Sequence, residues 1–244
     1  MKGNAVNYEA LTPLSFLKRC SSIFGDKTAV IYEDKHWTWH EFSSRVNRLA
    51  NALRDIGLRR GERVALFFVH GQDLLEANYG VPQCGAVLVP INYRLSRKEI
   101  SYIMNHSESK ALFVDSELAN LVEPGDMPEV KTFVNIMEGK ATKQLPGVSY
   151  EELLKGAKDE YVKLELKDEN EPISINYTSG TTGPPKGVVF SHRGAYPNAL
   201  SDVIEMQLNP YSVFLWAVPM FHCNGWCFAW AVSCQGSTSA VITR

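Results

Sequence analysis

Strand-like runs alternate with helical stretches along the first half of this 244-residue chain. The runs are short and rich in β-branched and apolar side chains, which is typical of buried strands. They cover residues 28–32, 63–69, 86–91 and 111–114. Strands that alternate with helices of about ten residues form a parallel sheet with right-handed crossovers. We therefore predict an α/β fold.

Capping boxes mark the starts of three predicted helices. In this motif a Ser or Thr and a Glu three residues later satisfy each other's backbone N–H groups at the helix start. The pairs are Thr38 with Glu41, Ser96 with Glu99, and Ser149 with Glu152. Apolar residues at helical spacing follow the first pair as far as Gly57, which is a typical helix stop.

The remaining elements and a charged stretch suggest two units. Further helices are predicted at 14–23, 73–81 and 193–208, further strands at 131–136, 213–218 and 237–243, and a helical, aromatic-rich segment around 226–230. Residues 158–171 are dense in charge, and we expect them to form a solvated linker. We predict a first α/β subdomain over residues 1–170 and the start of a second, incomplete one over residues 171–244.

Composition places the chain among globular proteins and limits its partners. Hydrophobic residues make up 45% and charged residues 21%, and the net charge is −2. Such a balance gives no global attraction to nucleic acid or to an anionic membrane. No run approaches the ~18 apolar residues of a membrane-spanning helix, and the N-terminus lacks a secretory signal. We expect a cytoplasmic protein whose five cysteines are reduced.

Residues 173–192 form the most distinctive stretch. Two strand patterns, at 173–177 and 188–190, enclose ten residues with four hydroxyls, three glycines, two prolines and one lysine. Glycines let successive N–H groups converge, and the hydroxyls and Lys186 add donors and charge, so the loop suits a polyphosphate. It is not a Walker A loop, because Pro185 precedes Lys186 and Gly187 follows it. A plain hairpin with a solvated lysine is the alternative, but such turns need only two to five residues.

Two segments carry a family resemblance. Tyr177-Thr-Ser-Gly-Thr-Thr-Gly-Pro-Pro-Lys186-Gly-Val resembles the phosphate-binding signature of the AMP-forming acyl-CoA synthetases and their relatives, the adenylation domains and luciferases. Pro219-Met-Phe-His222-Cys-Asn-Gly-Trp226 resembles the His-containing acyl-pocket segment of that family. Family members are longer, and their downstream motifs are not found in these 244 residues. The chain therefore resembles the N-terminal portion of such an enzyme.

The resemblance implies a set of site residues. The residues that would cradle the phosphates of ATP are Thr178, Ser179, Gly180, Thr181, Thr182, Gly183 and Lys186. The Thr178 hydroxyl would also lie near Mg²⁺. His222 would lie near the acyl carboxylate and the α-phosphate, and Trp226 would wall the acyl pocket. Packed core residues are the alternative for both aromatic side chains.

The same resemblance implies a fatty acid–CoA ligase that uses ATP to convert a carboxylate into an acyl-adenylate and then transfers the acyl group to coenzyme A. The segment 221–230 carries no charged residue, which favours an apolar acyl chain. Other readings are a ligase for an aryl or amino acid, and a non-catalytic nucleotide-binding remnant or subunit. We do not expect these residues alone to complete adenylation, and exposed apolar surface where further structure packs would favour a homo-oligomer.

Overall fold

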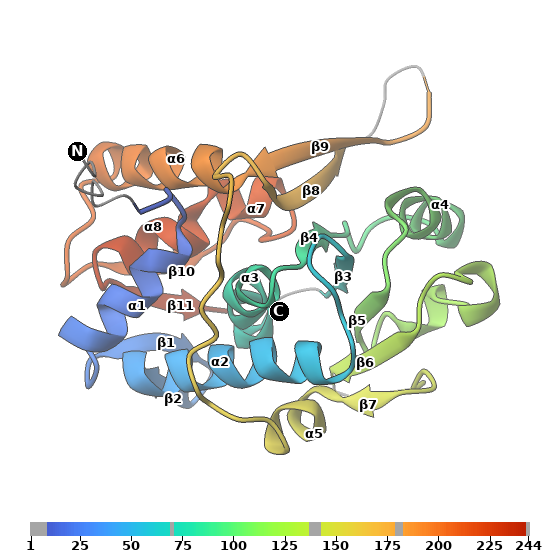
Figure 1. The fold of residues 1–244 in the computed structure, drawn as a ribbon, viewed down its shortest axis with the longest axis horizontal. Helices are drawn as coiled ribbons and strands as arrows, with labels where there is room; N and C mark the ends of the chain where they lie inside the picture. The colour runs from blue at the N-terminus through green and yellow to red at the C-terminus, as the bar shows by residue number, and fades with distance from the viewer. Residues whose placement is uncertain (1–8, 69–70, 137–142, 179–182, 243–244) are drawn as a thin grey trace, which may run out of the picture.

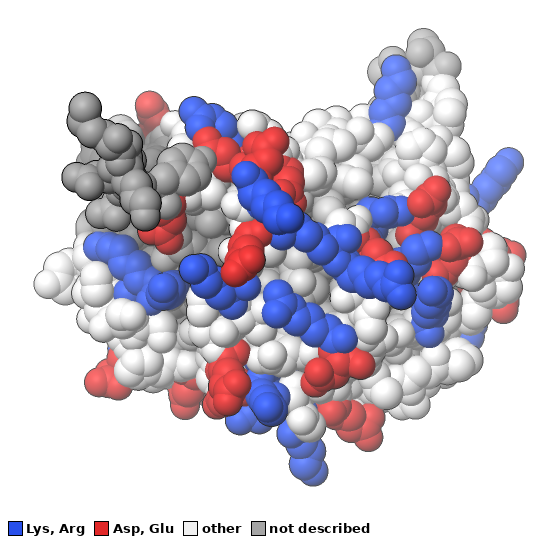
Figure 2. All heavy atoms as spheres, viewed as in Figure 1, with Lys and Arg blue, Asp and Glu red and all other residues white. Residues whose placement is uncertain are grey.

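The computed structural model describes residues 9–68, 71–136, 143–178 and 183–242. Within these ranges the strands form a seven-stranded and a four-stranded sheet, with helices between and around them (Figure 1). No helix of the described ranges is both long and apolar enough to cross a bilayer. Acidic and basic side chains are interspersed on the face shown in Figure 2.

The larger sheet has the strand order β7-β6-β5-β3-β4-β8-β9. Its strands are β3 (Arg63–Phe67), β4 (Val87–Pro90), β5 (Ala111–Asp115), β6 (Thr132–Ile136), β7 (Val148–Ser149), β8 (Pro172–Thr178) and β9 (Lys186–Ser191). All neighbours are parallel except β8 and β9, which form an antiparallel hairpin at the sheet's edge. The predicted parallel α/β sheet is therefore confirmed.

Helices cover both faces of this larger sheet. Val64 and Leu66 of β3 belong to one apolar cluster, and Ala65 and Phe67 belong to another, as the alternation of a strand requires. The helices in this part of the chain are α2 (Trp39–Asp55), α3 (Gln72–Cys84), α4 (Arg97–Ser107) and α5 (Tyr150–Lys155), with short 3-10 turns at Ala119–Leu121 and Pro124–Asp126. All three predicted capping boxes are formed, at the starts of α2, α4 and α5.

The smaller sheet joins distant parts of the chain. Its strand order is β10 (Val213–Trp216), β11 (Thr238–Val241), β1 (Thr28–Tyr32) and β2 (Lys35–Thr38). The remaining helices are α1 (Leu14–Ile23), α6 (His192–Glu205), α7 (Cys223–Trp226) and α8 (Phe228–Cys234). Of these, α8 packs against β11, whereas α6 and α7 contact β8 of the larger sheet. Each sheet takes strands from both sides of residue 170, so the predicted subdomain boundary does not separate the sheets.

Helix α3 lies between the two sheets and connects them (Figure 1). Every residue of α3 is buried. On one side it packs against β4, and on the other it bonds to α8, where the Trp230 indole donates to the Asn78 carbonyl at 3.2 Å. The Tyr79 hydroxyl donates to the Ala229 carbonyl, also at 3.2 Å. The two sheets therefore share one packed interior.

The charge-dense segment 158–171 is anchored rather than free. It runs beside α2 before entering β8 (Figure 1). The Asn51 amide donates to the carbonyls of Lys158 and Glu160, each at 2.9 Å. Arg60 donates to the Glu165 carbonyl at 2.6 Å and pairs with the Glu171 carboxylate at 2.5 Å. The segment is largely exposed, as predicted, but it is not a free linker. Hydrogen bonds from Asn51 and Arg60 to its backbone carbonyls fix its path.

Candidate functional site

The β8–β9 hairpin presents the predicted phosphate loop. Thr178 and Lys186 are paired across the hairpin drawn in Figure 1. Both are exposed. Gly183 is exposed as well, and a Cβ added there would meet nothing within 4 Å. The other four predicted loop residues, Ser179, Gly180, Thr181 and Thr182, lie outside the described residues.

Lys186 begins β9 with its side chain exposed at the base of the loop. This side chain makes no hydrogen bond or ion pair with any residue that the structure describes. Its charge is therefore available to an anion held by the loop. Gly187 has a packing role instead, because a Cβ there would lie 2.9 Å from the Ile175 side chain on the facing strand.

Strand β8 buries its polar residues. Ser174 and Asn176 are as buried as Ile173, because α7 packs beside this strand. The Ser174 hydroxyl donates to the Asn176 side-chain oxygen at 3.1 Å. The alternation in 173–177 predicted the strand correctly, but it gave no signal that both faces would be covered.

These buried amides join the two predicted motifs. The Asn176 amide donates to the Phe221 carbonyl at 3.2 Å, and the Asn224 amide donates to the Ser174 hydroxyl at 2.5 Å. The segment that carries His222 is thereby fixed to the strand that leads into the phosphate loop. The side-chain oxygen of Asn224 has no partner among the described residues. Sequence reasoning missed all three side chains.

The segment after His222 turns left-handed. Residues 223–227 have φ between 49° and 67°, and Gly225 is the one glycine among them. Such φ values cost an L-residue roughly 1–2 kcal/mol each. A Cβ on Gly225 would lie 2.4 Å from the Trp216 ring, so the turn packs its backbone directly onto that ring. The single helical segment predicted through Trp230 is therefore wrong, since α7 and α8 are separated at Cys227.

His222 precedes this turn and Trp226 lies within it, and both side chains are exposed. Trp226 is 60% exposed, and the ring nitrogen Nδ1 of His222 lies 3.1 Å from the Cys223 sulfur. The alternative of two packed core residues therefore does not hold. Both side chains face outward, where a ligand could contact them.

His192, by contrast, has a structural place. It begins α6, is buried, and its Nδ1 lies 2.9 Å from the Thr12 hydroxyl. Burial lowers the pKa of His192 to about 4, although the nearby Glu171 acts to raise it. The neutral ring thus ties the N-terminal segment to the end of the hairpin.

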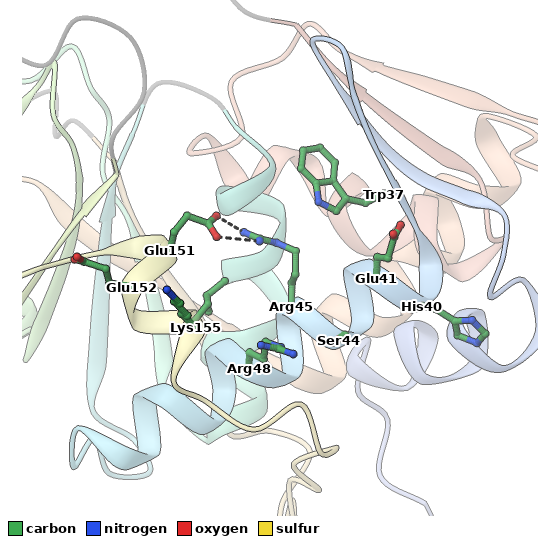
Figure 3. A pocket seen from close by; sticks show the side chains of 10 residues that line it. Trp37, His40, Glu41, Ser44, Arg45, Arg48, Glu151, Glu152 and Lys155 are labelled. Carbon is green, nitrogen blue, oxygen red and sulfur yellow. Dashed lines mark hydrogen bonds and ion pairs between the residues drawn. The ribbon is translucent and has the colours of Figure 1, made fainter.

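A pocket away from the β8–β9 hairpin lies between α2, α5 and β2 (Figure 3). It has a volume of about 750 Å³ and includes Arg45, Arg48 and Lys155 in its lining. Arg45 pairs with Glu151 at 2.7 Å and with the fully buried Glu76 at 2.5 Å. The Arg45 guanidinium thereby links α2, α3 and α5. Its positive charge is already neutralised by these two carboxylates.

The sequence of the chain is similar to those of known proteins of one family. Residues 17–244 match the AMP-binding enzyme family, so the chain belongs to it. It is 40% identical over 245 residues to 4-hydroxybutyrate–CoA ligase 2 of Metallosphaera sedula, covering 97% of this chain and 44% of that protein. It is 37% identical over 249 residues to butyrate–CoA ligase AAE11 of Arabidopsis thaliana, with 97% and 44% covered.

Comparison with solved structures agrees with this family assignment. The inhibitor-bound N-terminal domain of FACL13 from Mycobacterium tuberculosis superposes with a TM-score of 0.84 at 25% identity, covering 95% of this chain and 57% of that domain. The predicted family and fold are thus confirmed: the chain belongs to the AMP-binding enzyme family and has the fold of the N-terminal domain of FACL13. It spans about 44% of the length of the curated relatives that it matches.

Proposed function

We propose that this chain supplies the phosphate loop and the acyl-binding segment of a ligase that joins a short-chain fatty acid to coenzyme A at the expense of ATP. One observation carries the proposal. Buried hydrogen bonds hold the segment that carries His222 against β8, the strand that leads to Thr178. They are made by Ser174, Asn176 and Asn224. Groups suited to a polyphosphate and to an acyl group are thereby placed on adjoining segments.

The loop would hold the β- and γ-phosphates of ATP. In the proposal Thr178, Lys186 and the residues from 179 to 183 surround these phosphates. Exposure of Thr178 and Lys186, and the absence of a described partner for Lys186, support this role. The Thr178 hydroxyl is an oxygen ligand that fits Mg²⁺, with phosphate oxygens and water as the others. Bound Mg²⁺ would neutralise charge on the phosphates.

The proposed reaction has two steps. A carboxylate oxygen bonds to the α-phosphorus of ATP while the bond to the β-phosphate oxygen breaks, which releases pyrophosphate. The coenzyme A thiol then loses its proton and its sulfur bonds to the acyl carbon, which releases AMP. Lys186 would stabilise charge on the departing phosphates, and His222 would donate a hydrogen bond at the reacting carboxylate.

The acyl group is proposed to be short and apolar. Trp226 offers an exposed indole face beside His222, and no charged residue lies between Phe221 and Trp230. The two relatives described above act, by name, on four-carbon acids. We therefore propose butyrate or a similar acid as the substrate, with aryl acids as the competing class.

Carboxylate-dependent exchange of labelled pyrophosphate into ATP tests the proposal, measured on a chimera in which this chain replaces the matched region of the Metallosphaera sedula ligase. Butyrate, 4-hydroxybutyrate, benzoate, palmitate and glycine are compared at equal concentration. Exchange that is fastest with the four-carbon acids supports the proposal, and exchange fastest with benzoate or glycine assigns an aryl or amino acid instead. ATP binding with no exchange for any acid contradicts catalysis by this chain and favours a nucleotide-binding subunit.

A further inference from the structure

The β8–β9 hairpin projects from the larger sheet on its way to the predicted phosphate loop (Figure 1). Within the described chain, β8 pairs with β4 at one position, Leu88 with Ser174. The described residues that follow Ser174, as far as Thr178, pair with β9 alone. A two-stranded ribbon is at best marginally stable in water. Side-chain contacts to neighbouring segments are therefore needed to fix the base of the loop.

Two hydrogen bonds on opposite faces of β8 provide such contacts. On one face the Asn176 amide donates to the Phe221 carbonyl, as described above. Tyr177 follows Asn176 in the strand and so points to the other face. There its hydroxyl oxygen lies 2.7 Å from Nδ1 of His106, a residue of α4. The hairpin is thereby held between α4 and the segment that carries His222.

The contact between His106 and Tyr177 is enclosed by other groups. Tyr102 lies one turn earlier on α4, and its ring stacks on that of His106 with centroids 5.4 Å apart and planes 25° apart. The Tyr177 ring meets the His106 ring edge-on, with centroids 5.7 Å apart. On the facing strand, a Cβ added at Gly187 would lie 3.4 Å from the Tyr177 ring. The Tyr177 side chain is therefore fixed between β9 and α4.

The Tyr177 hydroxyl is a neutral hydrogen-bond donor. Burial raises the pKa of its phenol, and Tyr102 acts in the same direction, although Arg63 acts to lower it. The phenol therefore keeps its proton at neutral pH and can donate a hydrogen bond to an unprotonated Nδ1 of His106. Because His106 is exposed, the contact orders a side chain that would otherwise move freely.

We propose that His106 is a positioning residue of the phosphate site. Through its hydrogen bond to Tyr177 it holds Thr178 and Lys186, at the base of the loop, in the arrangement that binds the phosphates of ATP. This role rests on the proposed function of the loop and adds to it a residue of α4 that lies 71 positions before Tyr177. A loop without this contact would hold the phosphates less tightly in the substrate and in the transition state alike. Such a uniform loss raises KM for ATP and leaves kcat unchanged.

Pyrophosphate exchange by the chimera described above tests this role. His106→Phe keeps an aromatic ring and removes the nitrogen, and Tyr177→Phe removes the hydroxyl. Each substitution should raise KM for ATP about fivefold, as expected for one lost hydrogen bond, with kcat and KM for butyrate unchanged. The double variant should be no worse than either single variant, because both substitutions remove the same bond.

His106→Asn is the conservative variant. The side-chain oxygen of asparagine is bonded to Cγ, as Nδ1 of histidine is, so it can accept a hydrogen bond from Tyr177. This variant should bring KM for ATP to within about twofold of the wild type, since the hydrogen bond is retained. His36→Phe is the matched control, because His36 is also exposed but lies on β2 of the other sheet, and it should change nothing.

Two measurements on the chain itself need no catalysis. Calorimetric titration of ATP should show the same fivefold loss as a change in Kd, about fivefold for each phenylalanine variant. Backbone amides at 175–178 and 186–189 should also exchange hydrogen about fivefold faster in both phenylalanine variants, and at the wild-type rate in His106→Asn. A wild-type chimera that exchanges no pyrophosphate contradicts the proposed ligase and leaves these two measurements to decide on His106.

Three results would overturn the positioning role. They are ATP affinity and hairpin amide exchange that do not change in His106→Phe, effects of His106→Phe and Tyr177→Phe that add in the double variant, and His106→Asn as impaired as His106→Phe. If one phenylalanine variant fails to fold, the other removes the same hydrogen bond from the opposite side. A change in kcat with KM for ATP unchanged would likewise contradict a residue that acts only by placing the loop.

Discussion

Lys186 is the one charged side chain among the ten residues from 178 to 187. A charge-assisted contact to phosphate contributes roughly 1.5–3 kcal/mol, so Lys186→Ala should weaken ATP binding at least about tenfold. Lys98→Ala is the control, since Lys98 is also exposed but lies on α4. Calorimetric titration of ATP measures both variants. Equal affinities for the two would contradict a phosphate-binding role for Lys186.

His192 should make stability fall in mild acid. Its pKa is lowered from 6.5 to about 4 in the folded chain by burial, so the unfolded chain binds the proton first as the pH falls. Stability therefore decreases between pH 6.5 and pH 4. By linkage the contribution of this residue drops by about 2 kcal/mol from pH 7 to pH 5.

His192→Asn tests this contribution, because the asparagine side-chain oxygen can accept a hydrogen bond from the Thr12 hydroxyl and asparagine does not titrate. Urea unfolding at pH 7 and pH 5 should show a pH-dependent loss smaller in the variant than in the wild type by about 2 kcal/mol. His36→Asn, at an exposed position, should leave the wild-type loss intact. An unchanged loss in His192→Asn would refute the linkage.

The residues of the candidate site were only partly predictable. A loop of hydroxyl residues, glycines and one lysine predicts a phosphate-binding site, because few other functions need that composition. Ser174 and Asn176 carry no such signal, since short polar residues in a strand pattern usually face water, and Asn224 lies in a segment that the sequence predicts as helical. Their burial depends on α7 packing beside β8, which is a tertiary contact between residues about 50 positions apart.

At the scale of elements, the left-handed turn of α7 makes the sharpest prediction. Asn224 has φ of 52° and donates to the buried Ser174 hydroxyl. Asn224→Gly keeps the backbone conformation and loses the hydrogen bond, which should cost about 1 kcal/mol. Asn224→Ala loses the bond and also adopts an unfavourable φ, which should cost roughly 1–2 kcal/mol more.

Urea unfolding of the two variants measures the difference between those costs. The glycine variant serves as the control for the alanine variant, because both lack the amide. If Asn224→Ala were as stable as Asn224→Gly, the turn would not be left-handed in solution. The pair therefore separates backbone strain from the lost hydrogen bond.

Elements and their starts were more predictable than their arrangement. Three capping boxes and the alternation of strands and helices are local patterns, and each gave its element at the expected place. The strand order is set by pairings between distant residues, such as Val30 with Ser239, for which no local pattern exists. For the same reason the charged segment 158–171 looked like a boundary, although strands on both sides of it share each sheet.

At the scale of the molecule, α3 makes the two sheets one cooperative unit. Of the five tryptophans, Trp37 and Trp216 belong to the four-stranded sheet, and Trp39 and Trp230 lie on α2 and α8, which pack against it. Tryptophan fluorescence therefore reports mainly on the side of that sheet, while far-UV circular dichroism reports on the whole chain. Because the completely buried α3 contacts both β4 and α8, we expect the two signals to change at the same urea concentration.

Leu75→Ala sharpens this prediction. Leu75 is a buried residue of α3 in the apolar cluster shared by both sheets, and its truncation should cost about 2–5 kcal/mol. Both signals should then shift together to a lower midpoint. A fluorescence midpoint that stays in place while the circular dichroism midpoint falls would mean that the four-stranded sheet unfolds separately, and α3 would not couple the sheets.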